Sequence, residues 1–134
     1  MVGIDTNVLI RYLLQDDAEQ SVVANEFFET KISALEKGFV CSVVLCEVVW
    51  VLRRSYAVER HAIAEILSRL LSLDRIEVEH EECAIRAVSD FAEGTADFSD
   101  YYLARVNKEK HHAATTVTFD KNAAQSDLFR LLRP

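Results

Sequence analysis

The feature of this sequence that most constrains its fold is the alternation of short, β-branched apolar segments with longer segments of helical spacing. Strands are expected at residues 1–5, 39–41, 75–80, 113–119 and 128–132, and helices at 8–14, 17–37, 43–56, 59–71, 81–93 and 100–110. This alternation favours an α/β fold, a three-layer α/β/α sandwich with a mainly parallel central sheet and right-handed crossovers. A chain of 134 residues has the length of one domain, expected to span residues 1–134.

The composition is that of an ordinary folded protein. Hydrophobic residues make up 50% of the chain and charged residues 28%, which argues against intrinsic disorder. No apolar run approaches the roughly 20 residues of a membrane span, and the N-terminus lacks the pattern of a signal peptide. We therefore expect a cytoplasmic protein with no membrane partner. The cysteine, histidine and glycine spacings match neither zinc sites nor phosphate-binding loops.

The net charge of -7 argues against a general nucleic-acid binder, which normally carries a basic patch. It suits a protein whose acidic side chains hold a cation, or one that has a basic partner.

Four acidic residues stand in apolar surroundings. Asp5 follows the apolar N-terminus, Glu47 interrupts the apolar stretch 39–52, Asp100 precedes Tyr-Tyr-Leu-Ala, and Asp120 follows Thr-Thr-Val-Thr-Phe. Burial of an unpaired carboxylate costs several kcal/mol or neutralises the group. We therefore expect these acids to be withdrawn from solvent and to share a divalent cation.

Three of the four acids also have purely structural explanations. Asp5 could cap the helix that follows it, although Thr6 or Asn7 could serve as the cap. Asp100 could reach back to the N–H of an Asp97 cap, and Asp120 could stabilise a turn.

Glu47 needs a different explanation because it lies inside its predicted helix. Its neighbours three and four positions away are Val43, Val44, Trp50 and Val51, which predicts that Glu47 is on the apolar face. Either Arg54 pairs with it or a metal ion balances its charge.

The expected topology favours a shared metal ion over separate structural roles for the acidic residues. In parallel sheets, ligands bind beyond the carboxyl ends of the strands, where Asp5 and Asp120 are predicted to lie. Asp100 is expected in the first turn of a helix. Clustered carboxylates suit hard cations such as Mg²⁺ or Mn²⁺.

Four segments, in this order, resemble the PIN domain and, more narrowly, the VapC-type toxin ribonucleases of type II toxin–antitoxin systems. They are residues 4–9, 42–52, 97–104 and 118–121. The resemblance covers nearly the whole chain. It departs from the usual pattern at Tyr101, where the family commonly has alanine after the third acid.

The resemblance implies a Mg²⁺- or Mn²⁺-dependent endoribonuclease with Asp5, Glu47, Asp100 and Asp120 as its acidic quartet. Asp97 would be an outer metal ligand. Thr6 and Asn7 match the polar residues that follow the first acid in the family. Independently of the resemblance, Lys121 and Arg54 are expected to contact substrate phosphates around the cleft. The implied partners are RNA, a small antitoxin protein and a second copy of the chain.

Two other functions fit the same residues. One is a PIN nuclease of RNA processing, or one acting on DNA, without a toxin role. The other is a catalytically silent α/β module that binds a metal or a partner. A receiver-like module fits poorly, because the chain lacks an acidic pair after its first strand.

Overall fold

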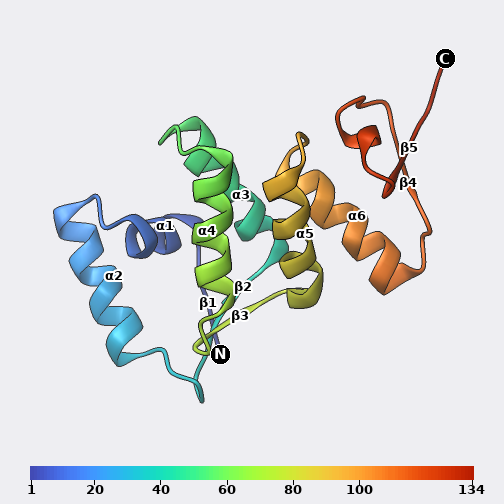
Figure 1. The fold of residues 1–134 in the computed structure, drawn as a ribbon. Coiled ribbons are helices and arrows are strands. Elements are labelled where there is room, and N and C mark those ends of the chain that lie inside the picture. The colour runs from blue at the N-terminus through green and yellow to red at the C-terminus, as the bar shows by residue number, and fades with distance from the viewer. The chain divides into compact units, whose positions relative to one another are not determined.

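A computed structural model describes all residues 1–134, which divide into two compact units, Met1–Glu79 and His80–Pro134 (Figure 1). The predicted α/β fold with parallel strands is confirmed, since every strand pair in both units is parallel. Hydrogen bonding divides the strands into a three-stranded and a two-stranded sheet. No helix is both long enough and apolar enough to cross a membrane.

The first unit contains the three-stranded sheet in the order β1-β2-β3. Gly3 of β1 pairs with Phe39 of β2, and Val40 of β2 pairs with Val78 of β3. The elements of this unit are β1 (Val2–Gly3), α1 (Thr6–Leu14), α2 (Ala18–Thr30), β2 (Gly38–Val40), α3 (Ser42–Arg54), α4 (Arg60–Leu71) and β3 (Ile76–Val78). Each parallel strand pair is therefore joined through helices, as crossover connections require.

Helix α3 shows how this unit forms its core. Its buried residues are Val44, Leu45, Val48, Val49 and Leu52. Their spacing places them on one stripe of the helix, which is the stripe that packs inward. Burying each such aliphatic side chain stabilises the fold by about 1.5–3 kcal/mol relative to exposure.

The prediction of one helix over residues 17–37 is wrong at its C-terminal end. Helix α2 ends at Thr30, and Gly38 belongs to strand β2 instead of terminating a helix. The helical spacing continues to Leu35, but that side chain is 98% exposed, so no burial stabilises a longer helix. Gly38 is instead needed for packing, because a Cβ there would lie 3.1 Å from Cγ1 of Ile4 and 3.2 Å from Cδ1 of Ile76.

The second unit pairs two helices and carries the two-stranded sheet. Its elements are α5 (Glu81–Glu93), α6 (Phe98–His111), β4 (Thr116–Thr118), the 3-10 helix η1 (Ala123–Gln125) and β5 (Phe129–Leu131). The ring of Phe91 in α5 meets that of Phe98 in α6 edge to face, with centroids 6.0 Å apart. Arg105 adds two 2.8 Å hydrogen bonds to the carboxylate of Asp90. Aromatic packing and this bidentate ion pair therefore hold α6 on α5.

Candidate active site

Asp5 lies between strand β1 and helix α1 and is the N-cap residue of that helix. Its Oδ1 accepts a hydrogen bond from the backbone N–H of Thr6 at 2.8 Å. The cap is therefore Asp5 itself, and the prediction of Thr6 or Asn7 in this role is wrong. The cap fixes the carboxylate through one oxygen and leaves Oδ2 available to another ligand.

Thr6 connects this cap to the neighbouring helix α3. It is only 6% exposed, and its hydroxyl donates a long hydrogen bond of 3.4 Å to Oε1 of Glu47. Two of the predicted acids, Asp5 and Glu47, thus extend from adjoining elements of the first unit, and the intervening hydroxyl helps orient Glu47.

The surroundings of Glu47 differ from the expectation. Glu47 is exposed instead of lying on the buried face of α3, and two of its apolar neighbours, Val43 and Trp50, are 67% and 59% exposed. Apolar residues surround this helix on several sides, so their spacing did not identify the inward stripe. The alternative partner Arg54 stacks its guanidinium over Trp50, 5.6 Å from the ring centroid, and makes no ion pair with Glu47.

Asp100 lies in the first turn of α6, where Asp97 is the N-cap residue. Burial raises the pKa of the Asp100 carboxyl, and the negative charges of Asp97 and Asp120 raise it further. A hydrogen bond with the Asp97 backbone acts in the opposite direction, as expected for an acid at the third helical position. In the second unit, Asp97 and Asp120 therefore lie close enough to Asp100 for their negative charges to act on its carboxyl group.

Asp120 follows strand β4 and holds a turn. Its Oδ1 accepts hydrogen bonds from the backbone N–H groups of Asn122 and Ala123, at 2.8 Å and 3.4 Å. Asp120 therefore stabilises a turn, as one of the structural explanations expected. Like the cap at Asp5, this role uses only one carboxylate oxygen. Lys121, expected to contact substrate, is exposed beside Asp120.

The expected burial of the acids is wrong for three of the four. Asp5, Glu47 and Asp120 are exposed, and only Asp100 is half-buried. The apolar neighbours that suggested burial include Ile4 and Tyr101, which are themselves 5% and 4% exposed. Successive side chains leave a strand or helix in different directions, so a carboxylate can reach solvent beside a buried neighbour.

Carboxylate oxygens suit a hard divalent cation, and Asp5 in the first unit and Asp120 in the second each keep one oxygen outside the hydrogen bonds described above. The predicted quartet divides between the units, with Asp5 and Glu47 in the first and Asp100 and Asp120 in the second. Neither unit by itself brings three acidic, histidine or cysteine side chains into a metal-binding group.

Replacing Asp100 with Asn is expected to raise the melting temperature of the metal-free protein at neutral pH. The pKa of Asp100 is higher in the folded state than the ordinary value near 3.9, so between these two values the folded state binds more protons. Its stability therefore falls as pH rises through that window and stays reduced above it. Thermal melts in EDTA should show a higher melting temperature for Asp100→Asn than for wild type at pH 7, and no difference below the ordinary pKa. Equal melting temperatures at neutral pH would contradict this prediction.

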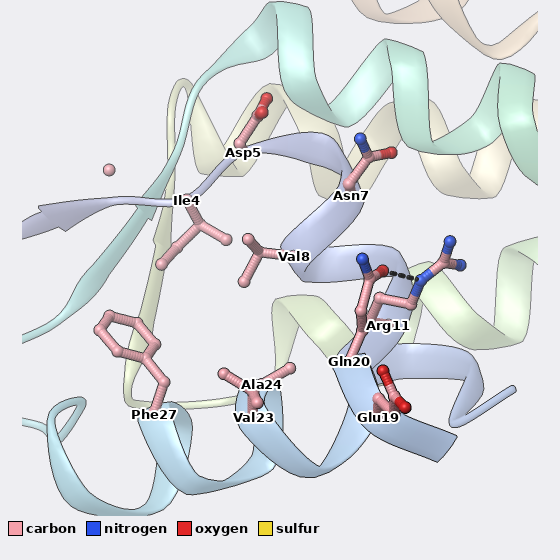
Figure 2. Close-up of a pocket in the computed structure, with 11 residues that line it drawn as sticks. Ile4, Asp5, Asn7, Val8, Arg11, Glu19, Gln20, Val23, Ala24 and Phe27 are labelled. Carbon is pink, nitrogen blue, oxygen red and sulfur yellow. Dashed lines mark hydrogen bonds between the residues drawn. The ribbon is translucent and has the colours of Figure 1, made fainter. Parts of the chain in front are cut away.

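An apolar pocket lies beside Asp5, between helices α1 and α2, and was not anticipated from the sequence (Figure 2). It has a volume of about 620 Å³, and Ile4, Val8 and Phe27 converge on it while the Asp5 carboxylate points away. Arg11 closes one side with a 2.7 Å hydrogen bond to Gln20. The adjacent valines Val22 and Val23 of α2 were the available sequence signal. Both are exposed, at 63% and 67%, and Val23 lines the pocket.

Comparison with known proteins identifies the class. The PIN domain family model matches residues 2–127, which include the parallel strands and the acidic residues that follow them. The chain therefore belongs to the PIN-domain family, whose members are generally nucleases that typically use a divalent metal. No curated protein and no solved structure matches the chain.

Proposed function

We propose that this chain is a Mg²⁺- or Mn²⁺-dependent endoribonuclease that acts in the cytoplasm as the toxin of a type II toxin–antitoxin pair. The observation that carries the proposal is the placement of Asp100, in a PIN domain, where burial and the negative charges of Asp97 and Asp120 raise its pKa. A bound cation would relieve that repulsion. In proteins, Mg²⁺ and Mn²⁺ are commonly bound by several carboxylate side chains that point toward the same ion.

We assign the acidic residues separate roles in metal binding and in catalysis. Asp5, Asp100 and Asp120 would hold the ion, and Asp97 would be an outer ligand. Bound divalent metal lowers the pKa of water and neutralises charge on the phosphate. Glu47, oriented by the Thr6 hydroxyl, positions the attacking water and accepts its proton.

Substrate contacts surround these acids. Lys121 contacts a phosphate beside Asp120, and Arg54 contacts the RNA backbone from α3. Asn7, exposed in the first turn of α1, adds a neutral polar contact. Together these side chains let a chain of net charge -7 bind a polyanion locally.

The apolar pocket between α1 and α2 supports the toxin part of the proposal. A segment of a small antitoxin seated there would lie beside Asp5, on the side opposite to its carboxylate. Apolar side chains of the antitoxin would fill the pocket. As a separate part of the proposal, two copies of the chain would form a homodimer.

Cleavage of a labelled total-RNA pool tests this function. The purified chain should produce discrete fragments in Mg²⁺ and in Mn²⁺ and none in EDTA, and a matched DNA pool should remain intact. Absence of cleavage by folded, Mn²⁺-loaded protein across transfer, ribosomal and messenger RNA would favour a silent binding module. Cleavage without growth arrest on expression would favour a nuclease of RNA processing.

A further inference from the structure

We propose that Tyr101 is a positioning residue for the acidic group of the second unit: its buried hydroxyl fixes the loop 94–97 that places Asp97 beside Asp100. This inference rests on the proposed metal-dependent function and identifies residues of this chain that support its site. It concerns a position where the sequence departs from the usual pattern of the family, so it describes this chain in particular.

The first observation is the hydrogen bond that the Tyr101 hydroxyl accepts. The backbone N–H of Ala96 donates to it at 3.2 Å, and both residues are buried, with Tyr101 4% and Ala96 2% exposed. Water cannot readily replace the hydroxyl as a partner for a buried N–H. The loop is therefore anchored one residue before Asp97.

The second observation is the fit between Tyr101 and Gly94. A Cβ at position 94 would lie 1.9 Å from the Tyr101 hydroxyl oxygen, 2.7 Å from Cζ and 2.9 Å from the carbonyl oxygen of Asp90. No side chain larger than hydrogen fits there while the ring keeps its place. Gly94 and Tyr101 thus depend on each other, and together they set the path of the loop between α5 and α6.

The third observation is a second attachment of the same loop. The hydroxyl of Thr95 donates a 3.3 Å hydrogen bond to Oε1 of Gln125. Gln125 is the last residue of η1, which directly follows the turn held by Asp120. The loop 94–97 is therefore attached both to the helix that carries Asp100 and to the segment that carries Asp120.

These two attachments give the loop a role in metal binding. Binding sites require their ligands to be held within about 0.5 Å of the productive geometry. The negative charges of Asp97 and Asp120 act on Asp100, and like charges held close together favour separation. The Tyr101 and Thr95 hydrogen bonds oppose that separation and keep the acids ready for a cation.

The test compares three variants of the full chain: Tyr101→Phe, Thr95→Val and the control Tyr12→Phe, whose ring stacks on Phe28 in the first unit. Titration with Mn²⁺, followed by the electron paramagnetic resonance signal of free Mn²⁺, gives the dissociation constant. Hydrogen exchange in EDTA reports the protection of the Ala96 N–H. Removing a partner that orients metal ligands weakens binding by about 10–100-fold, and we expect the lower end of this range for Tyr101→Phe.

We expect faster exchange at Ala96 together with weaker Mn²⁺ binding in Tyr101→Phe, a smaller weakening in Thr95→Val, and wild-type values in Tyr12→Phe. Faster exchange with an unchanged Mn²⁺ dissociation constant would show a purely structural role and overturn the positioning role alone. A wild-type chain that binds no Mn²⁺ would overturn the proposed metal-dependent function, and the positioning role with it.

Discussion

Replacing Asp100 with Asn is expected to lower the rate of Mn²⁺-dependent RNA cleavage about 1,000-fold, and Asp5→Asn should have a similar effect. The amide keeps the size of the side chain but removes the charge that holds the ion in the proposed site. A loss of about 1,000-fold corresponds to about 4 kcal/mol of transition-state stabilisation. Single-turnover cleavage of the RNA fragments that the wild-type chain produces measures this ratio.

Two exposed acids outside the candidate site provide matched controls. Asp74→Asn in the first unit and Asp127→Asn in the second remove the same charge and should cleave at the wild-type rate. Asp100→Asn should also melt at a higher temperature than wild type without metal, because the pKa of Asp100 is raised in the folded protein. Its inactivity could then not be attributed to unfolding, and substantial cleavage by this variant would contradict the assignment of Asp100.

Much of the fold could be predicted from the sequence because local signals agree with tertiary packing. Helix α5 was predicted at residues 81–93 and is found there, with Glu81 and Glu82 in its first turn and Gly94 after its end. Helix α2 was predicted too long because helical spacing continued into a segment where Leu35 has nothing to pack against. Periodicity therefore located the elements, and burial decided where they end.

The places of the acidic residues relative to the strands and helices were predictable, but their environment was not. Asp5 and Asp120 do follow parallel strands β1 and β4, as the alternation of elements indicated. Their exposure could not be predicted, since neighbouring apolar residues do not report the direction of a side chain. The contacts of Tyr101 with Gly94 and Ala96 depend on the path of a loop, which has no periodicity to interpret.

Replacing Phe91 with Ala is expected to lower the free energy of unfolding by about 3–5 kcal/mol, as large-to-small changes of core aromatics do. Phe91 is fully buried in α5, and its ring supports Phe98, the first residue of α6. Phe98 in turn packs against Tyr102, with ring centroids 5.5 Å apart. Urea unfolding followed by circular dichroism measures the loss.

Ile85→Ala in the same helix is the control, because Ile85 is 50% exposed and such surface changes usually stay within about 0.5 kcal/mol. Phe98 lies between Asp97 and Asp100 in the chain, so loss of the Phe91 ring removes a packing contact from the turn that carries these acids. The folded fraction of Phe91→Ala should therefore bind Mn²⁺ more weakly than Ile85→Ala does. Equal binding by the two variants would mean that the hydrogen bonds of the loop 94–97, independently of the aromatic core, hold these acids in place.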